Sequence, residues 1–189
     1  VDFAGNWALW QHGDLRRVAG GSLARRVGRR IAMAPDGRRI ALLTGSEGID
    51  FKWRAAIVDV ETGDVTPFGG VDFRRIVWTD VGLFAMGPLG YRLYDATGRE
   101  LVDGHHPPEP GSAWMGSAPT RDGSRIYYMS HHRIGGVVVA DGSALAAPDI
   151  TPFARGTGNG AWAFPEFAVN DDGAVLALGF LEEVLVWRI

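Results

Sequence analysis

The chain has 189 residues, of which 46% are hydrophobic and 22% are charged, and its formal net charge is −3. These are ordinary values for a folded protein, and they exclude long disordered stretches. The chain has no cysteine, which excludes disulfides, thiolate metal sites and cysteine nucleophiles and leaves the compartment open, export included. No apolar run approaches the roughly 18 residues that a membrane-spanning helix needs.

The N-terminal region combines a hairpin pattern with a concentration of arginine. The chain begins at Val1 rather than at Met, and we expect a processed product or an excised domain. Residues 6–19 (NWALWQHGDLRRVA) predict two strands joined by a turn. Residues 1–40 hold eight Arg and three Asp, a balance that can attract nucleic acid. We favour a solvated loop, because the rest of the chain is acidic and no aromatic residue interleaves with residues 22–30. Nucleic acid is therefore not an expected partner.

Four turn signals then recur along the chain. They are Asp36-Gly37, Asp80-Val81-Gly82, Asp122-Gly123 and Asp172-Gly173, with 44, 42 and 50 residues between successive aspartates. Each turn joins two short apolar runs, within residues 31–43, 76–86, 117–129 and 167–178. A period of about 40–45 residues with several strands per unit is typical of a β-propeller blade.

Each unit also predicts a second hairpin. The segments 55–68, 91–102 and 136–153 contain turns at Thr62-Gly63, Thr97-Gly98 and Asp141-Gly142, where glycine supplies the positive φ of a tight turn. A blade has four antiparallel strands, named A to D from the central channel outward. We therefore expect an all-β protein with A–B and C–D hairpins in units at about 31–68, 74–103 and 113–153. No segment of 12 or more residues shows helical periodicity.

The two ends of the chain predict incomplete blades. Residues 164–189 predict strands A, B and C, whereas residues 6–19 predict a C–D hairpin. We expect the N-terminal outer strand to pair with the C-terminal inner strands, so that 1–20 complete the unit at 162–189 and leave no open sheet edge. Residues 1–189 then form a single small propeller of about four blades. Because Trp7–Gln11 and Val184–Trp187 both predict strand C, five blades or a piece of a larger propeller stays an alternative.

The stretch APDGRRIALLT (34–44), with weaker copies at 119–130 and 170–179, resembles the TolB-type, WD-like propeller repeat. In that family a small residue, Pro-Asp-Gly, a basic pair and an apolar strand mark the A–B hairpin. The second unit departs from this pattern, since it reads TDVG, and the WD dipeptide is absent. The resemblance implies a scaffold that binds proteins or peptides, or that accompanies a separate catalytic domain. It implies an architectural role for Asp36, Asp122 and Asp172.

The connections between strands predict which face of the disk binds a partner. The A–B and C–D turns are short and leave one face, whereas the D–A and B–C connections are long and varied and leave the other. Variable loops on a rigid scaffold concentrate binding residues, so we predict that the second face binds. Aromatic and Arg anchors are typical of such surfaces. The candidate binding residues are Glu47, Asp50, Phe51, Trp53, Trp114, Arg133 and Trp162. The competing interpretation is that Trp53, Trp78, Trp114 and Trp162 pack between blades.

Two histidine pairs fall in connections on that same face. His105 and His106 precede the third unit, and His131 and His132 lie in its B–C connection. Such a cluster could bind Zn²⁺ or act as a pH switch. Adjacent histidines point in different directions along an extended chain, and their spacing matches no metal motif, so ordinary surface histidines are the alternative. We predict no cofactor.

Catalytic motifs are missing from the sequence. There is no Gly-x-Ser-x-Gly elbow, and GTGNG (156–160) lacks the Lys-Ser/Thr of a phosphate-binding loop. We therefore expect a non-enzymatic binding scaffold that engages a protein or peptide through the face with the long connections. The alternatives are a propeller that binds carbohydrate or another small ligand, as the accessory domain of a hydrolase, and a metal-assisted enzyme that uses the histidine loops.

Overall fold

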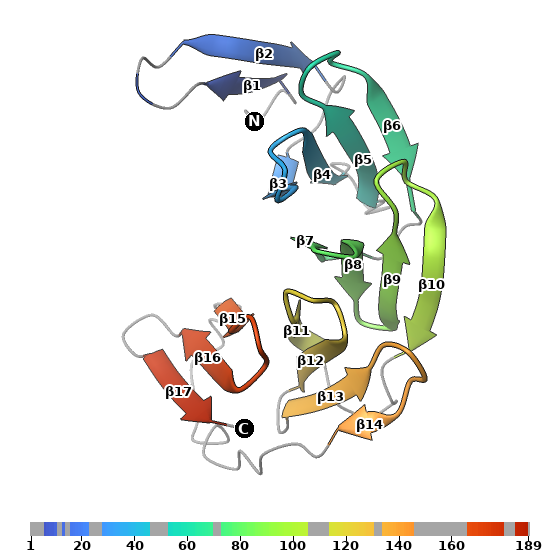
Figure 1. Cartoon of the computed structure of the whole chain (residues 1–189), viewed down its shortest axis with the longest axis vertical. Coiled ribbons are helices and arrows are strands. Elements are labelled where there is room, and N and C mark those ends of the chain that lie inside the picture. Colours follow the sequence, from blue (N-terminus) through green and yellow to red (C-terminus); the bar gives the residue numbers. More distant parts are fainter. Residues whose placement is uncertain are drawn as a thin grey trace.

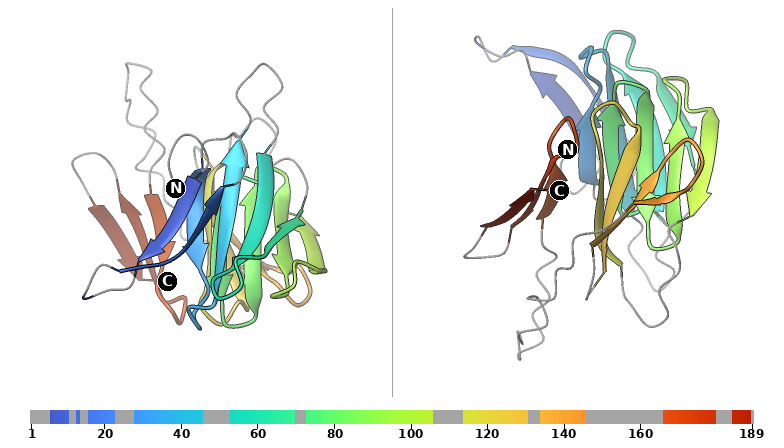
Figure 2. Two further views of the ribbon diagram at one scale, coloured as in Figure 1. Left: turned by 90° about the horizontal axis from the view of Figure 1, so that it is seen from above. Right: turned by 60° about the horizontal axis from the view of Figure 1, so that its bottom comes forward.

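The computed structural model describes residues 6–10, 13, 16–22, 28–45, 53–69, 73–105, 114–130, 134–145, 166–179 and 184–188. The regular secondary structure of these residues is β-strand throughout, arranged in five antiparallel sheets. The sheets stand beside one another along an arc, with the first strand of each blade on the inner side (Figure 1). The strands run across the arc, from one of its two faces to the other (Figure 2). The all-β class and the four-stranded antiparallel units are therefore confirmed.

Three of these sheets are four-stranded, and we call them the first, second and third blades. The first blade contains β3 (Gly28–Met33), β4 (Arg39–Gly45), β5 (Trp53–Asp59) and β6 (Val65–Phe68). The second contains β7 (Arg75–Thr79), β8 (Gly82–Gly87), β9 (Gly90–Tyr94) and β10 (Glu100–His105). The third contains β11 (Trp114–Pro119), β12 (Arg125–Ser130), β13 (Ile134–Val138) and β14 (Ala144–Leu145). Within each blade the strands pair in chain order, as the A-to-D arrangement predicts.

The two ends of the chain form smaller sheets. The N-terminal hairpin consists of β1 (Asn6–Trp10) and β2 (Arg17–Ser22), which confirms the hairpin predicted for residues 6–19. The C-terminal sheet consists of β15 (Glu166–Val169), β16 (Val175–Gly179) and β17 (Val184–Arg188).

The predicted closure of the ring is not confirmed, because no strand pairing joins the two ends of the chain among the residues that the structure describes. The N-terminal hairpin and the C-terminal sheet are separate sheets, and they lie at opposite ends of the arc (Figure 1). The physical reason is positional, because β1 precedes an outer strand and β17 follows two inner strands, so both occupy the third place of a blade. One blade cannot accept both strands in that place. The pairing of β1 with β2 closes only a short loop, costs little entropy and forms without the C-terminal sheet.

The A–B turns have the predicted chemistry in three of the four units. The aspartate side chain accepts the backbone N–H two residues on, from Arg38 to Asp36 at 2.9 Å, from Ser124 to Asp122 at 3.0 Å and from Ala174 to Asp172 at 2.9 Å. The following glycines adopt left-handed φ values of 70°, 70° and 73°. These bonds support the architectural role that the family resemblance implies for the three aspartates. The turn at Asp80 differs, because Thr79 and Gly82 pair directly across it.

The hydrophobic core lies between the sheets rather than within any one of them. The layer between the first and second blades contains Ala41, Leu43, Ile57, Leu83, Ala85 and Tyr94. The layer between the second and third blades contains Phe84, Met86, Leu93, Ile126 and Val137. The layer between the third blade and the C-terminal sheet contains Ala118, Tyr127, Met129, Phe167 and Leu176. Trp78 packs against the first of these layers, as the inter-blade interpretation predicts for it.

Candidate binding surface

Two of the predicted binding residues begin strands at the edge that faces the long connections. Trp53 is the first residue of β5 and lies opposite Gly45, and Trp114 is the first residue of β11 and lies opposite Ser130. In an antiparallel meander the starts of strands A and C share one edge of the blade, so both tryptophans border the same face. Glu47, Asp50, Phe51, Arg133 and Trp162 lie outside the described residues, and their binding role stays a prediction.

Leu89 adds an apolar side chain to this face that sequence reasoning missed. It lies in the short connection between β8 and β9, which is the B–C connection of the second blade. This residue is 73% exposed, more than any other large hydrophobic residue for which the structure describes the exposure. The sequence could have indicated Leu89, because it is an apolar residue that follows Pro88 where a B–C turn is expected. Its high exposure follows from its place at the tip of a tight connection.

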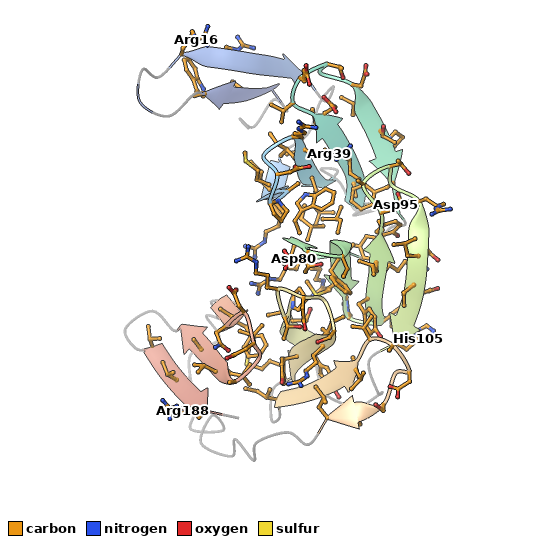
Figure 3. The ribbon with its side chains drawn as sticks, in the orientation of Figure 1. Arg16, Arg39, Asp80, Asp95, His105 and Arg188 are labelled. Carbon is orange, nitrogen blue, oxygen red and sulfur yellow. The ribbon has the colours of Figure 1, made fainter. Side chains whose placement is uncertain are left out.

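Of the predicted histidine cluster, the structure describes only His105. This residue ends β10, pairs with Gly90 and is exposed on the outer side of the arc (Figure 3). His106, His131 and His132 lie outside the described residues. Across the ranges that the structure does describe, no three His, Asp or Glu side chains gather as a metal site. A metal site in these loops therefore stays a prediction.

The opposite face carries carboxylates that are bound within their own turns. In the C–D turn of the second blade, Asp95 Oδ1 accepts bonds from Thr97 N at 2.8 Å, Thr97 Oγ1 at 2.6 Å and Arg99 N at 3.1 Å. These bonds, above all the one from the Thr97 hydroxyl, lower the pKa of Asp95 to about 2. The corresponding carboxyl in the first blade, Asp59, has a lowered pKa because the backbone N–H groups of Thr62 and Glu61 donate to it.

Arg121 joins three A–B turns on that same face. Its Nε lies 3.4 Å from Asp80 Oδ1 of the second blade, and its Nη1 lies 3.3 Å from Asp171 Oδ2 of the C-terminal sheet. Its carbonyl oxygen also accepts the N–H of Asp80 at 2.9 Å. The hydrogen bonds from Arg121 to these two carboxylates raise the pKa of Arg121, and the bond to Asp171 has the larger effect. The three side chains are 59%, 52% and 76% exposed, so water and salt screen both ion pairs and neither adds much to stability.

The described residues contain no helix that could cross a membrane.

No protein-family model matches the chain, and no curated protein matches its sequence. A solved structure does match: the β-propeller domain of Cps50 (Swd1) from Myceliophteria thermophila, with a TM-score of 0.66 and 12% sequence identity. The fold of this chain is of the β-propeller type. The match covers 99% of this chain and 59% of that domain, so the chain spans well under two thirds of the length of the structure that it resembles. This likeness does not distinguish a TolB-type repeat from other propeller repeats, and the TolB-type resemblance stays a prediction.

Proposed function

We propose that this chain is a binding scaffold without catalytic activity, and that it engages a protein or peptide through the face of the B–C and D–A connections. The observation that carries the proposal is the exposure of Leu89, which is 73% exposed on that face. Trp53 and Trp114 begin strands that border the same face. Apolar and aromatic side chains commonly provide most of the free energy of peptide binding.

The opposite face supports the same assignment by contrast. There the carboxylates of Asp59, Asp95 and Asp122 accept bonds from their own turns. Arg121 is paired with Asp80 and Asp171. A partner that bonds to these groups gains less than it would from groups without an internal bond, which makes this face the poorer binding surface.

The scaffold is suited to hold such a surface in place. Each apolar layer joins neighbouring sheets through side chains that are almost fully buried, such as Leu83, Phe84 and Phe167, each 0% exposed. Interiors packed in this way resist deformation, so the connections between strands are presented from a rigid base. Propellers host many functions, and the proposal therefore rests on the residues of the face rather than on the fold.

The experiment selects peptides by display against the purified chain and then measures their affinity for variants. We expect Leu89→Ala and Trp53→Ala to weaken binding about tenfold or more, as loss of an anchor does. The control is Val81→Ala, which removes a side chain that is 50% exposed in the A–B turn of the same blade, on the opposite face. Selected peptides that lose affinity only with Val81→Ala would contradict the assignment of the face. Binding of oligosaccharides in place of peptides would favour the alternative ligand class.

A further inference from the structure

The first blade has an apolar face that no neighbouring inner strand covers. We call the face of each sheet that is turned toward the preceding sheet its leading face, and the other its trailing face. On the leading face of the first blade, Ile31 lies opposite Leu42 and Met33 lies opposite Ile40. The two β4 residues are buried in a cluster with Val58, whereas Ile31 is 54% exposed and Met33 is 49% exposed.

The same position is covered in every sheet that follows. On the leading faces of β7, β11 and β15, the inner-strand residues Ile76, Ser117 and Phe167 are 5%, 0% and 0% exposed. Each of them lies against the sheet that precedes it along the arc. The exposure of Ile31 and Met33 therefore marks a position that the repeat normally buries, and it has a specific cause. The sheet that precedes the first blade is the N-terminal hairpin, which has only two strands.

The other end of the arc repeats this pattern on a trailing face. Val184 and Val186 of β17 are 69% and 62% exposed, and they lie on the side of the C-terminal sheet opposite Phe167. The third strands of the complete blades bury their trailing-face residues, with Ile57, Leu93 and Ile134 at 4%, 6% and 2% exposed. Both ends of the arc thus display side chains of the kind that form the layers between blades.

The N-terminal hairpin also has an unpaired strand edge at the same place. Within the described residues β1 pairs with β2 alone, and β1 lies on the inner side of β2 (Figure 1). β2 leads into the inner strand β3, as an outer strand D leads into the next strand A. Strands added to the free edge of β1 would therefore lie over Ile31 and Met33. A free edge beside uncovered apolar side chains is the usual setting for strand addition.

We propose that the two end faces are an interaction surface for polypeptide β-sheet from outside residues 1–189. One antiparallel hairpin of this partner pairs with β1 and covers Ile31 and Met33, and further sheet covers Val184 and Val186. The fold supports this occupant, because the solved propeller domain contains a substantial stretch of chain beyond the 59% that this chain matches.

A second copy of the chain fits the position less well. The vacancy beside β1 requires two inner strands, whereas the C-terminal sheet has three strands, and β17 would compete with β1 for the third place. The proposal is independent of the binding surface around Leu89, which lies in the B–C connection of the second blade, so the two can fail separately.

The test places the photo-reactive residue p-benzoylphenylalanine at single positions of the protein in the cells that naturally produce it. The variants are Met33→p-benzoylphenylalanine and Val186→p-benzoylphenylalanine. The control is the same change at Leu101, which is 45% exposed on β10, away from both end faces. Cross-linked peptides are identified by mass spectrometry, and amide hydrogen exchange of β1 is compared between the cross-linked complex and the purified chain.

We expect both variants, and not the Leu101 control, to cross-link to peptides outside residues 1–189, with exchange of the β1 amides slowed about tenfold or more. Cross-links to residues within 1–189 would show a second copy or internal closure and would overturn the proposal. Yields no higher than at Leu101 would show uncovered faces, with the same consequence. Cross-links without protection of β1 would show a partner that adds no strand, and they too would overturn it.

Discussion

At the scale of single residues, the aspartates of the turns act as acceptors for their own backbone. Asp95 is the clearest case, since it binds Thr97 through two groups and also forms an ion pair with Arg99 at 3.1 Å. Such bonds favour the charged carboxylate, which is why the pKa of Asp95 falls from 3.8 to about 2. A pKa that is lower in the folded state than in the unfolded chain makes stability depend on pH.

We expect Asp95→Asn to lower stability at pH 6 and to have a smaller effect as the pH falls. The contribution of the ionised carboxyl is present above pH 3.8 and is lost as the pH falls from there toward about 2. Urea unfolding at pH 6, 4 and 3 measures the difference between the two proteins. Glu61→Gln, which removes an exposed carboxyl from the C–D turn of the first blade, is the control. A difference that stays constant across this pH range would contradict the expectation.

At the scale of strands and sheets, the sequence predicts local pairing well. The apolar run at 31–43 becomes β3 and β4, and the turn glycines Gly63, Gly98 and Gly142 have φ values of 78°, 83° and 70°. These features depend on alternation and on turn chemistry, which are properties of adjacent residues. The predicted closure is not confirmed, and it was the least secure part of the prediction because pairing between distant strands leaves no comparable local pattern. The link from Arg121 to Asp80 and Asp171 was missed for the same reason, since it joins residues of three different sheets.

Phe167 lies in the apolar layer that joins the C-terminal sheet to the third blade. It is 0% exposed and packs with Tyr127 and Met129 in the layer between these two sheets. We expect Phe167→Ala to destabilise the protein by about 3–5 kcal/mol, as removal of a buried phenyl ring does. Hydrogen exchange measured by mass spectrometry should accelerate in β15–β17 and remain unchanged in the second blade.

The control for this prediction lies next to Phe167 in the chain. Ala168 is exposed on the other face of the same strand, so Ala168→Ser should change neither stability nor exchange appreciably. Equal acceleration of exchange in all sheets after Phe167→Ala would show that the sheets open together, and would contradict an attachment made by this layer.

At the scale of the whole molecule, the arc is a row of sheets in which each apolar layer joins neighbours. Stability in such arrays is approximately a sum over sheets and the interfaces between them. The leading face of the first blade is followed outward only by the two-stranded hairpin, and the trailing face of the C-terminal sheet has no neighbour among the described sheets. These two faces carry Ile31, Met33, Val184 and Val186. The same substitution should therefore lower stability by different amounts at different positions along the arc.

Ile31 and Ile76 provide a matched pair for this prediction. Both lie on leading faces of inner strands, but Ile31 is 54% exposed and Ile76 is 5% exposed. We expect Ile76→Thr to cost about 2 kcal/mol or more, because it places a hydroxyl in an apolar layer. Ile31→Thr should cost less than about 0.5 kcal/mol, because the side chain is already half exposed to water. Denaturant unfolding measures both costs, and equal losses of stability would contradict the prediction.

The pairing of each strand only with its neighbours in the chain also bears on how the protein folds. In the described residues every ladder joins consecutive strands, so pairing closes only short loops. Pairing across short loops favours fast formation of each sheet, even in a β protein. A blade whose four strands have left the ribosome contains all of its own pairing partners, and folding is expected to proceed blade by blade during synthesis.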